Sequence, residues 1–185
     1  PDGDKLAIGL RDETVLLLSF PEMEVLADPV IGMVPRRLRF SRDGTILAVR
    51  GSTAQVQILD LEGRGLTDLG DANGLRSSPS SLAWAPHDEA LAVACDNKAI
   101  YVFDLQKKQR GPRRILRGHA NAGIRLAWGA RRDSLVSVSW DSTVRVWDPD
   151  AGKQRLVLNA EAKFPFVSAD GARLGFVHQQ EFQVL

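Results

Sequence analysis

The sequence has few of the residues that mark several large classes of protein. It contains one cysteine, Cys95, in 185 residues, which excludes an internal disulfide and a zinc site built on several cysteines. No apolar run approaches the roughly 18 residues of a membrane-spanning helix, so no membrane segment is expected. A charge excess is also absent, because 24 basic residues face 23 acidic ones. The chain therefore has no overall field that would steer it to nucleic acid.

Motifs for cofactors and metals are missing too. No Gly-x-Gly-x-x-Gly or Walker sequence follows a strand and opens a helix, and His87 and His178 lack the spacing of zinc ligands. We expect no cofactor and no metal. The chain opens on Pro1-Asp2-Gly3 without a signal sequence, which suggests a segment of a longer protein that carries further domains. The lone cysteine fits a reducing compartment, so the cytoplasm is the default location.

A repeat dominates what is present. The segments starting at Leu47, Leu91 and Leu135 have similar sequences and lie 44 residues apart, and Leu6 and Leu174 begin similar segments 41 residues before and 39 residues after them. Other positions keep the same register, and they hold Phe40, Trp84 and Trp128; Leu59, Phe103 and Trp147; and Asp60, Asp104 and Asp148. A period of about 40 to 45 residues is typical of four-stranded propeller blades.

The local pattern within each repeat is that of strands. Residues 143–147 and 55–59 alternate between polar and apolar side chains, while residues 90–94 are apolar throughout, as in a strand covered on both sides. We predict strands near residues 45–50, 56–60, 89–94, 99–104, 134–139 and 143–148.

These observations predict an all-β fold, a β-propeller of four-stranded antiparallel blades. Residues 1–185 would form one domain, with repeats at about 1–34, 35–78, 79–122, 123–162 and 163–185. The first and last repeats have room for three strands each. We therefore expect a partial ring of about five blades from a larger propeller of about seven.

The repeat around residues 118–148 carries a more specific signature. Gly118-His119 is followed by Ser137, Asp141 and finally Trp147-Asp148. This stretch resembles the WD-repeat (WD40) family, in which these residue types occur in this order. The resemblance implies a structural relay of buried hydrogen bonds in which Asp141 orients His119, His119 reaches Ser137, and Ser137 reaches the indole N–H of Trp147.

The other repeats depart from this signature together. Ile31 and Leu75 stand where His119 does, and Ile8, Val49 and Val93 stand where Ser137 does. Where one polar residue of the relay is replaced by an apolar one, the others are replaced too, because a buried polar group without a hydrogen-bond partner is unfavourable. Ser41-Arg42-Asp43-Gly44 and residues 168–171 also resemble the propeller repeats of TolB-type proteins and of peptidase-associated domains, which is the alternative family.

A catalytic interpretation of His119, Ser137 and Asp141 competes with the relay. These are the residue types of a nucleophilic triad, but a nucleophilic serine needs an exposed sharp turn beside an oxyanion hole. Ser137 instead follows Leu135-Val136 inside a predicted strand. We therefore expect no catalytic residue in the chain, and Cys95 is expected to be a small buried apolar residue.

Two surfaces are candidates for binding a partner. Trp140 precedes the turn residue Asp141, and the aligned positions hold polar residues that include Arg11 and Asp96. Exposed tryptophan is a favoured anchor at protein interfaces, and packing of Trp140 against its own loop is the alternative. The second surface is a basic stretch between the third and fourth strands of its repeat, for which a solvated loop and an anion contact are alternatives. Its basic residues are Lys107, Lys108, Arg110, Arg113 and Arg114.

The resulting functional prediction is a non-catalytic scaffold. It binds other proteins through propeller faces and loops, with nucleic acid and membrane disfavoured as partners. The alternative is a propeller domain that gates or supports an enzyme domain, such as a kinase, NTPase or peptidase, elsewhere in the full-length chain.

Overall fold

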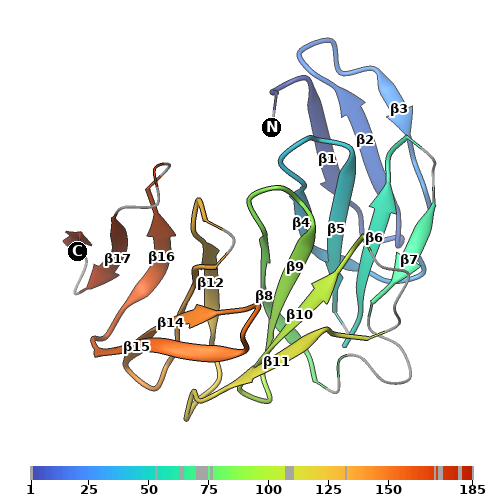
Figure 1. Cartoon of the computed structure of the whole chain (residues 1–185). Coiled ribbons are helices and arrows are strands. Elements are labelled where there is room, and N and C mark those ends of the chain that lie inside the picture. The colour runs from blue at the N-terminus through green and yellow to red at the C-terminus, as the bar shows by residue number, and fades with distance from the viewer. Residues whose placement is uncertain are drawn as a thin grey trace. The chain divides into compact units, whose positions relative to one another are not determined.

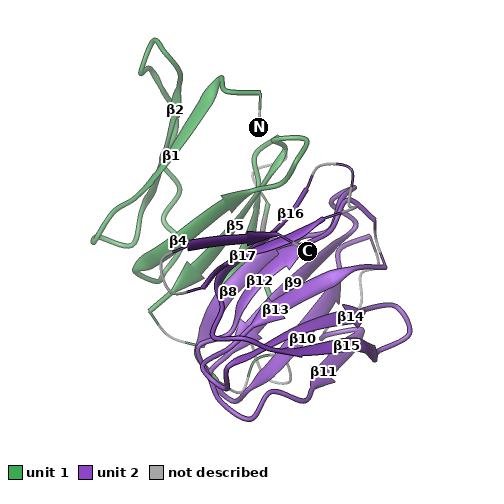
Figure 2. Ribbon diagram, turned by 90° about the vertical axis from the view of Figure 1, so that its left-hand side faces the viewer, with its two compact units in different colours: residues 1–78 green, residues 79–185 purple. Residues whose placement is uncertain are grey.

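The structure is a computed structural model that describes residues 2–52, 54–62, 65–69, 75, 77–106, 111–131, 133–168, 170, 173–178 and 181–184. These residues form strands and turns without any helix, so the all-β prediction is confirmed (Figure 1). The chain divides into two compact units, residues 1–78 and residues 79–185 (Figure 2).

Unit 1 contains two antiparallel sheets in which each strand pairs with the next along the chain. The three-stranded sheet has the order β1 (Lys5–Gly9), β2 (Val15–Ser19) and β3 (Val25–Ala27). The four-stranded sheet has the order β4 (Pro35–Phe40), β5 (Ile46–Gly51), β6 (Val56–Asp60) and β7 (Leu66–Asp68). One apolar core joins them, formed by Val15, Ile31, Met33, Leu47, Val49 and Leu59.

Unit 2 contains three sheets of the same meander topology. The first is built from β8 (Pro79–Trp84), β9 (Ala90–Cys95), β10 (Ala99–Asp104) and β11 (Arg114–Arg117). The second is built from β12 (Arg125–Trp128), β13 (Leu135–Val138), β14 (Thr143–Asp148) and β15 (Lys153–Asn159). The third is built from β16 (Lys163–Val167), β17 (Leu174–His178) and β18 (Glu181–Val184).

The core of unit 2 explains the continuous apolar strands. Every residue of β9 is buried, whereas nearly every residue of β15 is exposed at the edge of its sheet. Burial on both faces requires apolar side chains at consecutive positions, which is the pattern of residues 90–95. Ile100, Leu126 and Trp147 complete the cluster between the first two sheets.

Hydrogen bonds also join the innermost strands of these two sheets. The hydroxyl of Ser81 accepts from the backbone N–H of Leu126 at 3.2 Å. The hydroxyl of Ser80 lies 3.1 Å from the carbonyl oxygen of Ile124. These serines satisfy backbone groups that would otherwise be unpaired between the sheets.

The observed strands follow the predicted ones closely. The six predicted strands correspond to β5, β6, β9, β10, β13 and β14, whose bounds differ by at most one residue. The sheets hold three, four, four, four and three strands in chain order, as the repeat register predicted. The division into five repeats within one propeller domain stays a prediction.

Candidate partner-binding face

The turn between β13 and β14 has the same construction as two other turns of the chain. The backbone N–H of Thr143 donates to Asp141 Oδ1 at 3.0 Å, and Ser142 has a left-handed φ of 59°. The same bond and a left-handed residue recur at Asn97 and Lys98, and at Asp12 and Glu13. Trp140, Asp96 and Arg11 therefore occupy one structural position, each preceding the Asp or Asn that closes its turn.

A chain of hydrogen bonds ties the Trp140 turn to two strands and a loop. Nδ1 of His119 lies 2.9 Å from Asp141 Oδ2, and Nε2 of His119 lies 2.7 Å from the hydroxyl of Ser137. The indole N–H of Trp147 donates to the same hydroxyl at 2.8 Å. The structure thus brings together the four residues of the predicted relay: His119, Ser137, Asp141 and Trp147. Their functional role stays a proposal.

The donors and acceptors fit only one neutral tautomer of His119. A carboxylate can only accept, so Nδ1 carries the proton that is donated to Asp141. Nε2 then accepts from Ser137, whose oxygen receives the indole N–H of Trp147. Burial lowers the pKa of His119 against the opposing effect of the bond to Asp141. The imidazole is therefore held neutral.

Asp141, in contrast to His119, is held in its ionised form. Burial would raise its pKa, but hydrogen bonds from the Thr143 side chain, the Ala120 backbone and His119 outweigh burial and lower the pKa to about 2. The Ala120 N–H donates to Asp141 Oδ2 at 2.8 Å, so the carboxylate also fixes the loop that follows His119. A permanent negative charge thus orients the relay.

Further bonds fix the loop of residues 118–124 to the Trp140 turn. The buried hydroxyl of Ser139 lies 2.9 Å from the carbonyl oxygens of both Asn121 and Ala122. The backbone N–H of Trp140 donates to the carbonyl oxygen of Ala122 at 3.2 Å. The loop and the turn therefore form one bonded surface at this end of unit 2.

Trp140 is the most exposed aromatic residue on that surface. Its side chain is 73% exposed, although the indole rests against Gly123. A β-carbon at residue 123 would lie 2.3 Å from two indole ring atoms, and Gly123 has a φ of +70°. Glycine is thus required both for the backbone and for the close approach of the ring. The outer face of the indole stays available for a partner.

Asp96 and Arg11 are also exposed, in separate turns. Asp96 lies in the β9–β10 turn of unit 2, in the sheet next to that of Trp140. Arg11 belongs to the β1–β2 turn of unit 1. Of the three aligned candidates, only Trp140 presents a large apolar surface that could anchor an interface.

Only part of the basic stretch lies within the described residues. Lys107, Lys108 and Arg110 lie outside the described residues. Arg113 is largely buried, and its guanidinium contacts Asp150 Oδ1 at 2.7 Å and Asp104 Oδ2 at 3.9 Å. Arg114 begins β11 and donates through Nε to the carbonyl oxygen of Asp150 at 3.1 Å.

That Arg113 and Arg114 contact a partner stays a prediction. Both guanidinium groups are used to connect β11 to the turn after β14, which carries Asp150. This turn and the Trp140 turn lie at opposite ends of β14. The pairing of Arg113 with Asp150 has no signal in the sequence, because it joins residues about one blade apart.

Two residues with potentially reactive side chains, Ser137 and Cys95, are buried within strands. Ser137 is fully buried within β13, which leaves no path for a substrate to its hydroxyl. Cys95 is buried in β9, and burial raises the pKa of its thiol to about 12.

In the described part of the chain, no three His, Cys, Asp or Glu residues gather in a way that could hold a metal ion. The same residues include no helix long and apolar enough to cross a membrane.

Sequence reasoning missed Gly123, although the sequence contains a signal. Gly123 lies four residues after His119 in a short polar loop, where glycine often marks a left-handed turn. It also missed Ser80 and Ser81, whose bonds to the neighbouring sheet follow no repeat signature.

Comparisons with known proteins agree with the repeat and its geometry. The family model described as "WD domain, G-beta repeat" matches residues 110–148, the segment that contains the relay. WD repeat-containing protein 1 of Xenopus tropicalis is 24% identical over 139 residues, which is 74% of this chain and 23% of that protein. The 66 kDa stress protein of Physarum polycephalum is 28% identical over 149 residues, 78% of this chain and 24% of that protein.

A human relative gives a similar result. Echinoderm microtubule-associated protein-like 2 is 27% identical over 147 residues, 78% of this chain and 22% of that protein. The chain thus spans less than a quarter of the length of these relatives. Domains of this kind generally act as scaffolds for protein interactions. The repeat spacing, the four-stranded sheets, the matched repeat and these relatives together support a WD-repeat propeller family.

Proposed function

We propose that this chain is a non-catalytic scaffold that binds a protein partner through the Trp140 face. This face is defined as Trp140, the β13–β14 turn that follows it, and the loop of residues 118–124. The observation that carries the proposal is an indole that is 73% exposed yet rests on Gly123. A large apolar ring on a fixed support can be buried by a partner with little loss of conformational entropy.

The support is held by hydrogen bonds between the turn, the loop and the strands beneath them. The relay, the Ser139 hydroxyl and the Trp140 backbone together bond the turn to the loop. In this arrangement the relay stabilises the face without contacting the partner. Substitutions of His119 or Ser137 should therefore weaken binding only through stability.

The chemistry of the face favours a protein over nucleic acid. An aromatic anchor at the centre of an interface contributes about 2 kcal/mol or more. The described basic side chains Arg113 and Arg114 are already paired at the opposite end of β14. The single buried Cys95 suits a reducing compartment, and we place this function in the cytoplasm.

Affinity isolation of the full-length protein from its native cells tests the proposal. The wild type, Trp140→Ala and a matched control, Phe182→Ala, are compared by quantitative mass spectrometry. Phe182 is also in unit 2 and is 76% exposed, so its loss removes a similar amount of exposed aromatic surface. We expect at least one protein to be lost with Trp140→Ala and retained with Phe182→Ala.

Two other results would lead to different assignments. Equal retention of every protein by a folded Trp140→Ala variant refutes the anchor. Nucleic acid captured in a salt-sensitive manner, and lost when the basic residues of 107–114 are neutralised, moves the binding function to the other end of the blade.

A further inference from the structure

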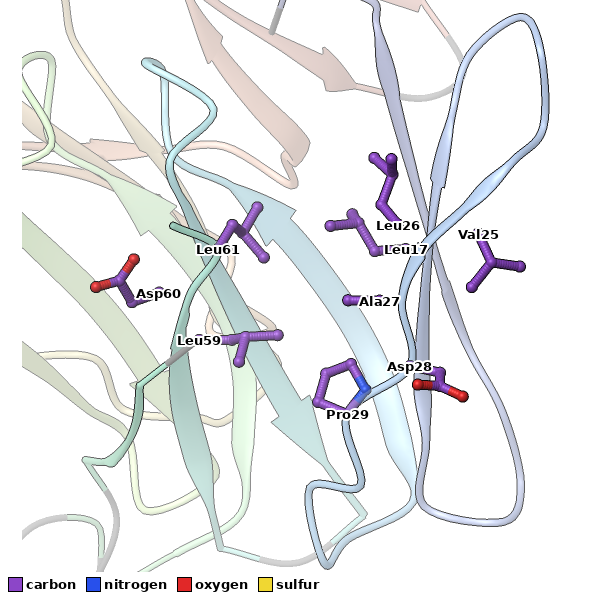
Figure 3. Close-up of a pocket in the computed structure, with 9 residues that line it drawn as sticks. All are labelled: Leu17, Val25, Leu26, Ala27, Asp28, Pro29, Leu59, Asp60 and Leu61. Atoms are coloured by element: carbon purple, nitrogen blue, oxygen red, sulfur yellow. The ribbon is translucent and has the colours of Figure 1, made fainter. Parts of the chain in front are cut away.

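A groove in unit 1 is separate from the Trp140 face and plays no part in the proposed function. It lies between the first sheet and β6 of the second (Figure 3). Leu17, Leu26 and Ala27 form one wall, and Leu59 and Leu61 face them across the space. The groove has a volume of about 300 Å³. Five of its lining side chains are therefore aliphatic and face one another.

A second hollow of about 210 Å³ adjoins the first. The two hollows share four lining residues, which are Leu17, Leu26, Ala27 and Leu61. Leu17 and Leu59 are each 4% exposed and form a buried floor, whereas Leu26 is 44% exposed and stands open at the wall. A bound chain can thus place one apolar side chain in each hollow.

The charges around the two hollows are mostly negative. Asp28 and Asp60 line the first, and Asp43 and Glu62 line the second, while Lys5 is the single basic lining residue. Lys5 already lies 3.6 Å from Asp4. The Asp60 carboxylate points away from Leu17 and Leu26, on the outer side of β6 (Figure 3).

One of these carboxylates, that of Asp43, is held in place by hydrogen bonds. Asp43 Oδ1 accepts from the Ser41 hydroxyl at 2.6 Å and from the Thr45 backbone at 3.0 Å. Bonds from Ser41 and Thr45 lower the pKa of Asp43, which keeps it ionised at neutral pH. Negative charges beside an apolar floor favour a ligand that is both apolar and cationic.

We propose that this groove binds a segment of a protein partner that carries two closely spaced aliphatic side chains flanked by Lys or Arg. The aliphatic side chains occupy the two hollows and cover Leu26. The flanking cations lie near Asp28, Asp43 and Glu62 within the distance at which physiological salt leaves charges unscreened, about 8 Å. A segment with acidic flanks is repelled by the same carboxylates.

Fluorescence anisotropy of labelled peptides tests this proposal with the intact chain at about 0.15 M salt. The probe is fluorescein-Lys-Lys-Leu-Ser-Leu-Lys-Lys. One comparison peptide has Glu in place of every Lys, and another has Ser in place of both Leu. We expect the first peptide to bind and each comparison peptide to bind at least roughly tenfold more weakly, which corresponds to about 1.4 kcal/mol.

Variants of the chain locate the binding site. Leu26→Ser and Asp28→Lys should each weaken binding of the first peptide by roughly tenfold. Val30→Ser is the matched control, because Val30 is 71% exposed and does not line the groove. Asp28 is an exposed charged residue, so its variant keeps the test decisive if Leu26→Ser does not fold.

Several outcomes would overturn the proposal. They are failure of the first peptide to bind, equal binding of the acidic peptide, and equal binding by the wild type, Leu26→Ser and Asp28→Lys. A wild type that dimerises in sedimentation while Leu26→Ser stays monomeric would assign the groove to a second copy of the chain. Trp140→Ala should leave peptide affinity unchanged, so failure here is distinguishable from failure of the proposed function.

Discussion

The indole of Trp140 lies over Gly123 so closely that a β-carbon at residue 123 would stand 2.3 Å from two ring atoms. Real β-carbons do not approach other atoms to this distance, so a side chain at residue 123 must displace the ring. The position of the exposed indole is therefore set by a residue in another loop.

Gly123→Ala should destabilise the protein by about 1 to 3 kcal/mol. A left-handed φ costs an L-residue about 1 to 2 kcal/mol, and displacement of the indole adds to this cost. Urea unfolding measures the change. Gly32→Ala is the control, because Gly32 has nearly the same φ, +69°, with nothing within 4 Å of the added carbon. A loss of stability no larger than that of the control would show that Trp140 does not depend on Gly123.

His119→Ala should destabilise the protein by about 1 to 3 kcal/mol, because it leaves buried groups of Ser137 and Asp141 without their partner. Thermal or urea unfolding measures the loss. His87→Ala, at an exposed turn residue, should change stability by less than about 0.5 kcal/mol. Similar effects of the two substitutions would mean that the relay bonds contribute little.

Stability should fall as the pH falls below 6.5. The pKa of His119 is lowered from 6.5 by burial, so the unfolded chain takes up a proton there at a pH where the folded chain does not. The contribution is therefore complete above pH 6.5 and is lost as the pH drops toward the folded value. Urea midpoints between pH 7.5 and 5 measure the slope, and His119→Gln should reduce it. An unchanged slope in that variant would assign the dependence to other groups.

Arg113→Ala should destabilise the protein, whereas Arg117→Ala, at an exposed residue of β11, should change its stability much less. The largely buried guanidinium of Arg113 contacts Asp104 at 3.9 Å and Asp150 at 2.7 Å, and its removal deletes both contacts. The expected cost is about 1 to 3 kcal/mol, and chemical unfolding measures it. Equal stability of the two variants would show that the ion pairs of Arg113 contribute little to the free energy of unfolding.

The strands and the relay were predictable because both depend on the repeat. Alignment of Leu47, Leu91 and Leu135 places the second and third strands of the three middle repeats, since one register repeats through them. His119, Ser137, Asp141 and Trp147 form one polar set that burial keeps together. Contacts between repeats have no such regularity. Neither the Arg113 pair with Asp150 nor the bond from Leu126 to Ser81 leaves a pattern within one repeat.

The support beneath Trp140 was only partly predictable. Exposure of Trp140 followed from the polar residues at the aligned positions, Arg11 and Asp96. Its contact with Gly123 did not, because it depends on how the loop after His119 folds back over the β13–β14 turn. The groove of unit 1 was equally hidden, since its walls come from β2 and β3 on one side and residues 59–61 on the other.

The dissociation constant of a purified partner, captured by the wild type, tests the Trp140 face most directly. Isothermal titration would compare the wild type, Trp140→Ala, Trp140→Phe and Phe182→Ala at one salt concentration. We expect roughly thirtyfold weaker binding for Trp140→Ala, which corresponds to about 2 kcal/mol, partial recovery with Trp140→Phe, and no change with Phe182→Ala. Equal affinity of the wild type and a folded Trp140→Ala variant would contradict the account.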